Sequence, residues 1–166
     1  RVAGVDEPVA VKVLYAHLAR EPEFVALFRQ EAQLAVRLTH TNLIKTYGSC
    51  LDCDRPFLVM ELVSGQNLSR ILRRLARPLP IRFALRVFLD VLSGLQAAHD
   101  LTDDTGAPLG LVHGDVTPHN ILVSESGASK LADFGIARTK AQLLGSVSSV
   151  VQGKLAYIAP EQLNEE

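Results

Sequence analysis

One short stretch of the chain, HGDVTPHNILV at residues 113–123, carries side chains whose types and spacing suit chemistry. Asp115 lies five positions before Asn120, and an apolar run follows the amide. A carboxylate can orient a hydroxyl and accept its proton, and carboxylate and amide oxygens are the hard donors that Mg²⁺ prefers. Taken alone, an Asp–Asn pair is more often part of a turn. The stretch therefore raises a question about the reaction that the other residues have to answer.

Two further charged side chains stand inside apolar segments, where a charge is costly unless it is paired. Lys12 lies within the apolar run VAVKVL at residues 9–14, and Glu31 shares a helical face with Phe28 and Leu34. Each of the two charges is therefore a candidate partner for the other.

The first part of the chain is predicted to contain three strands and one helix. Residues 9–14 are apolar and β-branched, which is typical of a buried strand. The sequence Glu-Pro-Glu at residues 21–23 suits the first turn of a helix. The residues that define one face of this helix at helical spacing are Phe24, Leu27, Phe28, Glu31, Leu34, Ala35 and Leu38. Residues 43–47 and 56–63 are predicted to form two more strands, joined by the polar turn SCLDCD.

The later part of the chain is predicted to be mainly helical. Residues 67–75 indicate a short basic helix, and residues 83–99 a long one after a proline-rich linker. The expected buried side of the long helix consists of Ala84, Leu85, Phe88, Val91, Leu92, Leu95 and Ala98. Strand-like pieces follow at residues 121–123 and 130–131. Because strands come early and helices dominate later, the sequence predicts an α+β fold in two parts.

Composition and charge limit the classes of partner. The chain has 166 residues, of which 48% are hydrophobic and 21% charged, the balance of an ordinary globular domain. The formal net charge of −1 gives no electrostatic argument for a nucleic-acid partner. No apolar run approaches the roughly 18 residues of a membrane span. We therefore expect neither nucleic-acid binding nor membrane contact within these residues.

Cys50 and Cys53 form a C-x-x-C pair. A structural zinc ion would need two more ligands at suitable spacing, and the sequence offers none. We therefore expect two thiols near a strand end in a reducing cytoplasm, and a redox or metal role is the alternative.

Five short motifs follow one another along the chain. They are Lys12 in VAVK, Glu31 on the following helix, HGDVTPHN at residues 113–120, Asp133-Phe134-Gly135 and Ala159-Pro160-Glu161. In this order and context they resemble the signature set of eukaryotic-type protein kinases. The segments GLVHGDVTPHNILV and LADFGIAR are similar to the large bacterial Ser/Thr kinase group of myxobacteria and their relatives. The resemblance covers nearly the whole chain.

Small-molecule kinases of the aminoglycoside and choline type are the other group that fits the opening stretch, since they often carry His-Gly-Asp. They share the Asp, the Asn and a later metal-binding Asp, but they lack an Ala-Pro-Glu that closes a loop after that Asp. Here the residues between Gly135 and Glu161 include Gly145, Gly153 and several serines, which is typical of an activation segment. The resemblance to protein kinases is therefore favoured, and the small-molecule kinase remains the less favoured interpretation.

The resemblance implies transfer of the γ-phosphate from Mg-ATP to Ser/Thr hydroxyls of protein substrates in bacterial signalling. It assigns Lys12 to the α- and β-phosphates of ATP and Glu31 to holding Lys12 in place. Asp115 would be the catalytic residue that orients the substrate hydroxyl and accepts its proton. Asn120 and Asp133 would bind Mg²⁺. The alternative interpretation of Lys12 and Glu31 is a buried ion pair that serves packing alone.

The resemblance also implies an adenine site. Met60 matches the gatekeeper position, and the backbones of Glu61 and Val63 would hydrogen-bond the adenine. Ala10 and Leu122 would form its apolar roof and floor. Ordinary core packing would satisfy these side chains equally well, so these assignments follow from the resemblance alone.

Gly114 departs from the family pattern, since many kinases have an Arg there that receives a phosphorylated activation-loop residue. Glycine offers no charge for this purpose. We therefore predict that activity does not depend on phosphorylation of Thr139, Ser146, Ser148 or Ser149.

Thr117 and Lys154 are the other departures. Thr117 stands where Ser/Thr kinases usually have a Lys that contacts the γ-phosphate, and Lys154 stands where they usually have a Thr before Ala-Pro-Glu. We therefore hypothesise that Lys154 is a catalytic residue that supplies the missing charge. A solvated loop lysine is the alternative.

The resemblance implies a protein kinase-like two-lobe fold, truncated at both ends, without the Gly-rich loop and the later large-lobe helices. Residues 1–63 would be part of the small lobe up to the hinge, and residues 64–166 part of the large lobe. Such a fragment is not expected to be active alone. The parent protein is expected to be cytoplasmic, unless a segment outside these residues anchors it to a membrane. The rival of another class is a pseudokinase that binds nucleotide without turnover.

Overall fold

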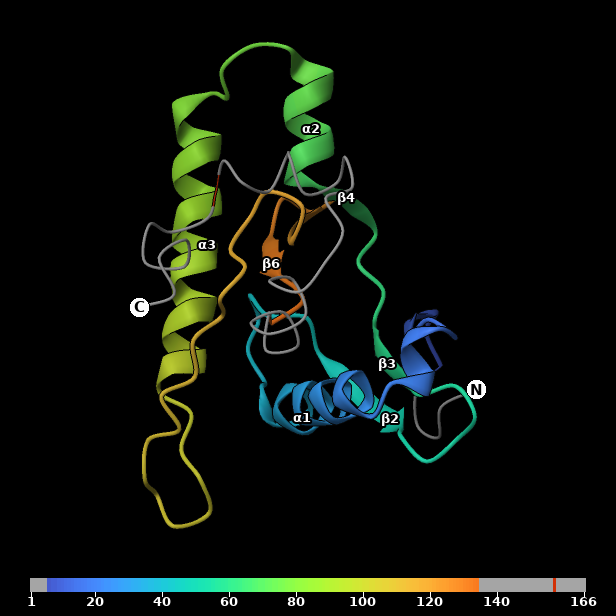
Figure 1. Cartoon of the computed structure of the whole chain (residues 1–166). Helices are drawn as coiled ribbons and strands as arrows, with labels where there is room; N and C mark the ends of the chain where they lie inside the picture. The colour runs from blue at the N-terminus through green and yellow to red at the C-terminus, as the bar shows by residue number, and fades with distance from the viewer. Residues whose placement is uncertain (1–5, 135–156, 158–166) are drawn as a thin grey trace.

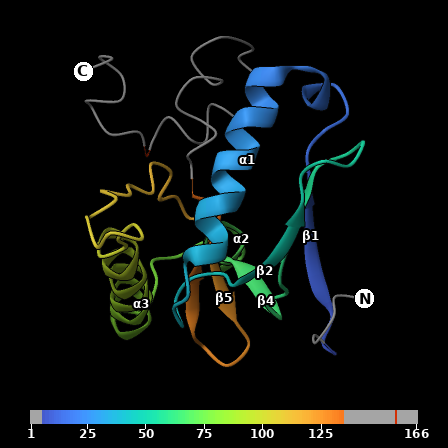
Figure 2. The same cartoon turned by 90° about the horizontal axis from the view of Figure 1, so that it is seen from below.

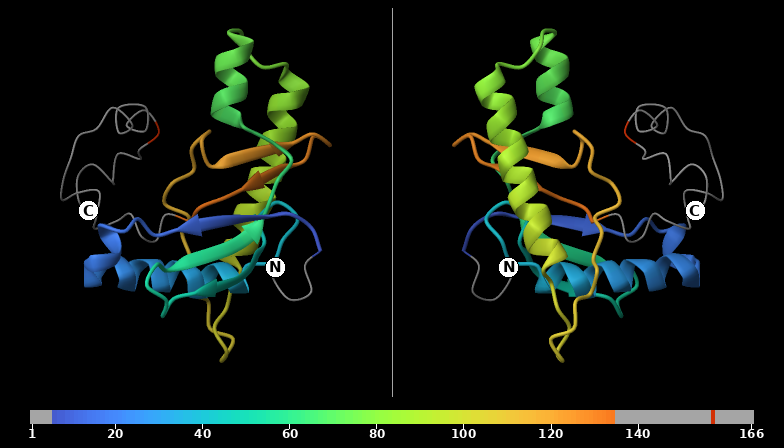
Figure 3. Two further views of the ribbon diagram at one scale, coloured as in Figure 1. Left: turned by 90° about the vertical axis from the view of Figure 1, so that its right-hand side faces the viewer. Right: turned by 90° about the vertical axis from the view of Figure 1, so that its left-hand side faces the viewer.

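The computed structural model describes residues 6–134 and Tyr157 (Figure 1). These residues form two three-stranded sheets with helices packed against them, which confirms the expected α+β class. In Figures 1 and 3 helix α1 (Pro22–Arg37) lies at the lower end beside the first sheet and α2 (Leu68–Leu75) at the upper end, while α3 (Ile81–His99) runs down past the second sheet.

The first sheet consists of β1 (Val9–Val13), β2 (Thr46–Cys50) and β3 (Phe57–Glu61), in the order β1-β3-β2 with antiparallel pairs. A 3-10 turn, η1 (Leu18–Arg20), leads into α1 (Pro22–Arg37), where proline occupies the first helical position. Figure 2 shows α1 running along this sheet. Their joint core contains Leu14, Phe28, Ala32 and Leu58.

The second sheet consists of β4 (Gly65–Asn67), β5 (Ile121–Ser124) and β6 (Ser129–Leu131), in that order and antiparallel. Helices α2 (Leu68–Leu75) and α3 (Ile81–His99) lie between β4 and β5 in the chain. The core of this part consists of Leu38, Leu43, Leu68, Val87, Val91, Ala98, Leu111, Ile121, Val123, Leu131 and Phe134. Because this core includes two residues that precede residue 63, the boundary between residues 63 and 64 stays a prediction.

The predicted strand at residues 43–47 is wrong in its bounds, because β2 starts only at Thr46. The residues before it pair with β6 instead. The Asn42 carbonyl accepts the Leu131 N–H at 2.8 Å, and the Ile44 N–H donates to the Leu131 carbonyl at 3.0 Å. The strand predicted at residues 56–63 ends at Glu61. The short, polar β4 was not predicted at all, since three residues are too few to show an alternation.

The predicted buried side of α3 is also partly wrong. Leu85, Phe88 and Leu92 are exposed, whereas Val91 and Ala98 are buried as expected. The buried stripe includes Gly94, where an added Cβ would lie 2.9 Å from the Asn42 carbonyl oxygen. Small residues therefore allow α3 to approach the chain at residue 42 closely, and this contact decides which face is buried.

Cys50 and Cys53 are joined by a disulfide bond, so the expectation of two thiols is not met in this structure. The turn after β2 brings their Cα atoms to 6.0 Å, within the usual range for a disulfide. No helix among residues 6–134 is long and apolar enough to cross a membrane.

A buried carboxylate on α3 anchors the turn between β5 and β6. Asp90 accepts the Ser129 N–H at 2.8 Å and pairs with Arg86 at 3.0 Å. Replacing Asp90 with alanine would leave the fully buried Ser129 N–H without its partner. We expect a loss of about 2–3 kcal/mol in the free energy of unfolding, measured by denaturant titration. The matched change Asp104→Ala, at a side chain that is 96% exposed, is expected to cost less than about 1 kcal/mol. Equal losses in the two variants would contradict this account.

Candidate active site

Lys12 binds two carboxylates that come from different parts of the fold. Its Nζ donates to Glu31 Oε1 at 2.6 Å and to Asp133 Oδ1 at 2.8 Å. Lys12 lies in β1, Glu31 in α1, and Asp133 follows β6. The predicted pairing of Lys12 with Glu31 is confirmed. The contact with Asp133, which lies 121 residues away along the chain, could not be predicted from the sequence.

Burial and the opposite charge nearby shift the pKa values of Lys12 and Glu31 in opposite directions. Desolvation by burial would lower the pKa of Lys12, but the carboxylates of Asp133 and Glu31 raise it, and the net pKa is above the ordinary value. Burial raises the pKa of Glu31; Lys12 offsets this in part, and Asp133 adds to it. Lys12 therefore stays protonated at neutral pH, and ionised Glu31 is costly to keep at this position.

The raised pKa of Glu31 predicts a pH dependence of stability. Between its ordinary pKa of 4.5 and the higher pKa of the folded protein, the folded state holds a proton that the unfolded chain has lost. The stabilisation from this proton is complete below pH 4.5 and is lost as the pH rises through the folded pKa. We therefore expect the wild type to lose stability relative to Glu31→Gln as the pH rises from 4.5, measured by urea unfolding. If the wild type instead gained stability relative to Glu31→Gln as the pH rises, the raised pKa of Glu31 would be contradicted.

The loop at residues 115–120 closes on itself through Asn120. The Asn120 Nδ2 donates to Asp115 Oδ2 at 2.7 Å and to the Asp115 carbonyl at 2.9 Å. The Asn120 N–H donates to the Thr117 carbonyl at 2.9 Å. Both Asp115 and Asn120 are buried. The amide therefore fixes the position of the carboxylate in the loop.

The same loop is tied to the strand that leads to Asp133. The Ala132 N–H donates to the Asn120 carbonyl at 2.8 Å, and His113 Nε2 lies 3.1 Å from the Ala132 carbonyl. His113 Nδ1 accepts the Asp115 N–H, so Nε2 carries the ring proton and donates. The His113 ring also contacts Phe134, with centroids 4.5 Å apart. Asp115, Asn120 and Asp133 are therefore held by one hydrogen-bonded unit.

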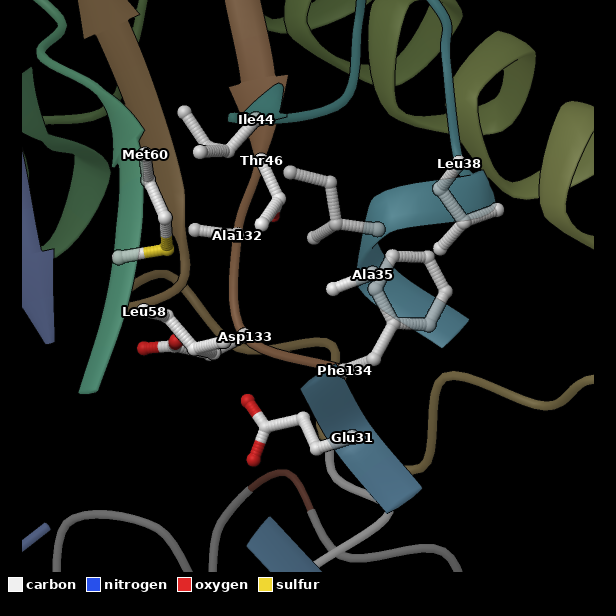
Figure 4. A pocket seen from close by; sticks show the side chains of 11 residues that line it. Glu31, Ala35, Leu38, Ile44, Thr46, Leu58, Met60, Ala132, Asp133 and Phe134 are labelled. Carbon is white, nitrogen blue, oxygen red and sulfur yellow. The ribbon is translucent and has the colours of Figure 1, made fainter. Parts of the chain in front are cut away.

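A small cavity of about 30 Å³ lies between α1, β3 and the end of β6 (Figure 4). Figure 4 shows the carboxylates of Glu31 and Asp133 at one side of it and Met60 at another. The remaining lining is mainly apolar and comprises Ala35, Leu38, Ile44, Thr46, Leu58, Leu131, Ala132 and Phe134. This volume is far below the roughly 300 Å³ or more of a typical ligand pocket.

The residues assigned to adenine come from both sheets. Ala10 lies opposite Met60 in the register of β1 and β3, and Leu122 lies in β5. The Glu61 N–H donates to the Lys45 carbonyl at 2.9 Å. The adenine assignments, that of Val63 included, stay predictions.

Sequence reasoning missed a second ion pair, between Glu61 and Lys130 at 2.9 Å. Both side chains are largely buried. The pair links the end of β3, in the first sheet, to β6, in the second. A lysine in a short strand gives no sign of a partner so distant in sequence.

Thr117 is 3% exposed, and its Oγ1 has no hydrogen-bond partner among the residues that the structure describes. Gly114 adopts a left-handed backbone (φ 71°), in which glycine is unstrained. The residues assigned to the activation segment lie outside the described residues: Thr139, Ser146, Ser148, Ser149, Lys154 and Glu161.

Comparisons with known proteins agree with this arrangement. Residues 3–166 match the protein kinase domain family. The chain is 39% identical to the tyrosine-protein kinase MasK of Myxococcus xanthus, over 96% of this chain and 25% of that protein. It is 40% identical to the serine/threonine-protein kinase PknL of Mycobacterium tuberculosis, over 97% of this chain and 38% of that protein.

A crystal structure of the PknI kinase domain of M. tuberculosis superposes with a TM-score of 0.67 at 29% identity, over 82% of this chain and 51% of that domain. The chain spans well under half the length of the two curated relatives, MasK and PknL. With the match over residues 3–166 and the shared fold, the chain belongs to the protein kinase family.

Proposed function

We propose that the protein containing this chain transfers the γ-phosphate of ATP to Ser/Thr hydroxyls of protein substrates in bacterial signalling. The observation that carries the proposal is that Glu31 and Asp133 both bind Lys12. The loop with Asp115 and Asn120 is joined to this site, because the N–H of Ala132, the residue before Asp133, donates to the Asn120 carbonyl. Phosphoryl transfer needs mainly positioning and charge neutralisation, and this cluster offers groups for both.

Lys12 is the cation in this proposal. Its ammonium group is held by Glu31 from α1, so a shift of the helix would move the charge. Its side chain is 32% exposed, which leaves it accessible to a phosphate. We assign Lys12 to the α- and β-phosphates of ATP and the neighbourhood of Ala10, Met60, Glu61, Val63 and Leu122 to the adenine.

The donor set fits Mg²⁺. Among residues 6–134 no group of three or more His, Cys, Asp or Glu side chains could hold a metal by itself. Mg²⁺ bound with a nucleotide needs only one or two protein carboxylates, because phosphate oxygens and waters complete its shell. Asp133 and Asn120 would hold the ion through their side-chain oxygens. When bound, Mg²⁺ would neutralise phosphate charge.

Asp115 is the proposed catalytic residue. Its carboxylate is fixed by Asn120, and its backbone N–H is fixed by His113. A carboxylate held in this way can orient the substrate hydroxyl and accept its proton. Lys154 stays a proposal as the residue that supplies the charge missing at Thr117.

Ser/Thr specificity and a cytoplasmic location are also proposals. Among the relatives, PknL is named a serine/threonine kinase and MasK a tyrosine kinase. The stronger support for Ser/Thr is that several relatives at about 40% identity carry that name. ATP as the donor supports a cytoplasmic location. In that compartment the Cys50–Cys53 disulfide would be exposed to reducing conditions.

The test is an acceptor assay with the full-length protein. It would be incubated with labelled Mg-ATP and, in separate reactions, a generic basic protein, choline and an aminoglycoside. We expect label on phosphoserine and phosphothreonine only. Label on tyrosine alone would overturn the Ser/Thr assignment, and label on a small molecule would favour the small-molecule kinase. Nucleotide binding without any transfer would favour the pseudokinase.

A further inference from the structure

The segment between Glu61 and Asp90 is strongly basic. It contains six arginines and no acidic residue, in a chain whose formal net charge is −1. The arginines, all exposed, are Arg70, Arg73, Arg74, Arg77, Arg82 and Arg86. The proposed catalytic roles use none of them.

Most of these charges have no carboxylate partner among the described residues. Arg86 pairs with Asp90 at 3.0 Å, and Arg74 donates only to the neutral Gln66 side chain at 3.4 Å. No ion pair is formed by Arg70 or Arg73 within residues 6–134. The charge of this segment is therefore available to an external partner.

Helix stability accounts for only part of the arrangement on α2. Arg70, Arg73 and Arg74 occupy positions i, i+3 and i+4 and so share one helical face, where like charges destabilise a helix. Cations in the last turn, such as Arg73 and Arg74, are favoured by the helix dipole. Arg70 lies in the first turn, where its own N–H is capped by Asn67 and a cation is disfavoured. We call these three residues the arginine face.

The arginine face begins beside the proposed catalytic loop. The Ser69 N–H donates to the Pro118 carbonyl at 2.9 Å, and Ser69 Oγ lies 3.1 Å from His119 Nε2. From there α2 leads away from the sheets (Figure 1). From Ser69 to Arg74 the helix rises about 7.5 Å, which an extended peptide covers in roughly two or three residues.

We propose that the arginine face is a docking surface for an acidic segment of the protein substrate, a few residues away from the phosphorylated hydroxyl. The inference rests on the proposed phosphotransfer to proteins. Guanidinium groups bind carboxylates in a forked geometry and suit such a segment. The contact of α2 with residues 118 and 119 favours a substrate peptide over an anionic membrane surface, because it places the start of α2 beside the loop that carries Asp115.

The test compares two serine peptides with the full-length protein. One carries Asp and Glu at positions three to six on either side of the serine, and the other carries Asn and Gln there. We expect the wild type to prefer the acidic peptide by about tenfold in kcat/KM, through KM, with the preference falling as salt is added. The variant Arg70→Gln/Arg73→Gln/Arg74→Gln is expected to lose the preference. The control Arg20→Gln/Arg55→Gln, exposed arginines beside the first sheet, is expected to keep it.

The outcomes separate this inference from the proposed function. Equal kcat/KM values for the two peptides in the wild type, or a preference that survives in the triple variant, would overturn the docking surface and leave the kinase activity standing. Equal kcat/KM values together with phosphatidylserine-vesicle binding that the triple variant loses would replace it with a membrane surface. Failure to phosphorylate either peptide, in a folded protein that binds ATP, would overturn both proposals.

Discussion

Replacing Asp115 with asparagine is expected to lower kcat by about 10³, with little change in the KM for ATP. The amide has almost the same shape and retains an oxygen for Asn120 Nδ2, which now lies 2.7 Å from Asp115 Oδ2. It cannot accept the proton of the substrate hydroxyl at neutral pH. The loss therefore falls on the chemical step, and steady-state kinetics with a protein acceptor would measure it.

The control for this variant is Asp104→Asn, which makes the same chemical change at a side chain that is 96% exposed. We expect its kcat to match that of the wild type. The account of Asp115 would be contradicted if Asp115→Asn, shown to be folded, kept kcat within threefold of the wild type.

Replacing Asp133 with asparagine is expected to lower kcat/KM by about 10³ and to raise the Mg²⁺ concentration required for half-maximal rate. Asp133 contributes a negative charge that would face the metal ion, and it also holds Lys12 Nζ at 2.8 Å. The amide keeps an oxygen but loses the charge. Rates measured over a range of Mg²⁺ concentrations would detect both effects, since high Mg²⁺ should restore part of the activity.

Asp52→Asn is the matched control for Asp133, because Asp52 also pairs with a cation, Arg29, at 2.8 Å and is 86% exposed. Its Mg²⁺ dependence is expected to be that of the wild type. An Asp133→Asn protein whose Mg²⁺ requirement is unchanged would show that Asp133 does not act through the metal.

The sequence predicted the parts of the site that leave a local trace. Lys12 and Glu31 are charges within apolar segments, and their cost in isolation indicated a partner. The contacts of Lys12 with Asp133 and of Glu61 with Lys130 give no such local sign, because they join residues that are 121 and 69 positions apart in the sequence and lie in or beside different sheets.

The errors in the predicted fold also come from contacts between residues far apart in the sequence. Apolar residues lie on more than one side of α3, so the period alone could not show that the face with Gly94 and Ala98 is buried and that Phe88 is exposed. Leu43 is apolar and suits a strand, but its neighbours pair with Leu131 in the other sheet. In both cases a tertiary contact decides between two local structures that suit the sequence equally well.

The most direct test of the central claim is a crystal structure of the full-length protein with Mg²⁺ and a non-hydrolysable ATP analogue. We expect oxygens of Asp133 and Asn120 within about 2.1 Å of the metal ion and Lys12 Nζ against the α- and β-phosphates. The Asp115 carboxylate should face the open side of the γ-phosphate. Phosphates bound away from Lys12, or a metal ion that touches neither Asp133 nor Asn120, would contradict the claim that these residues form one phosphoryl-transfer site.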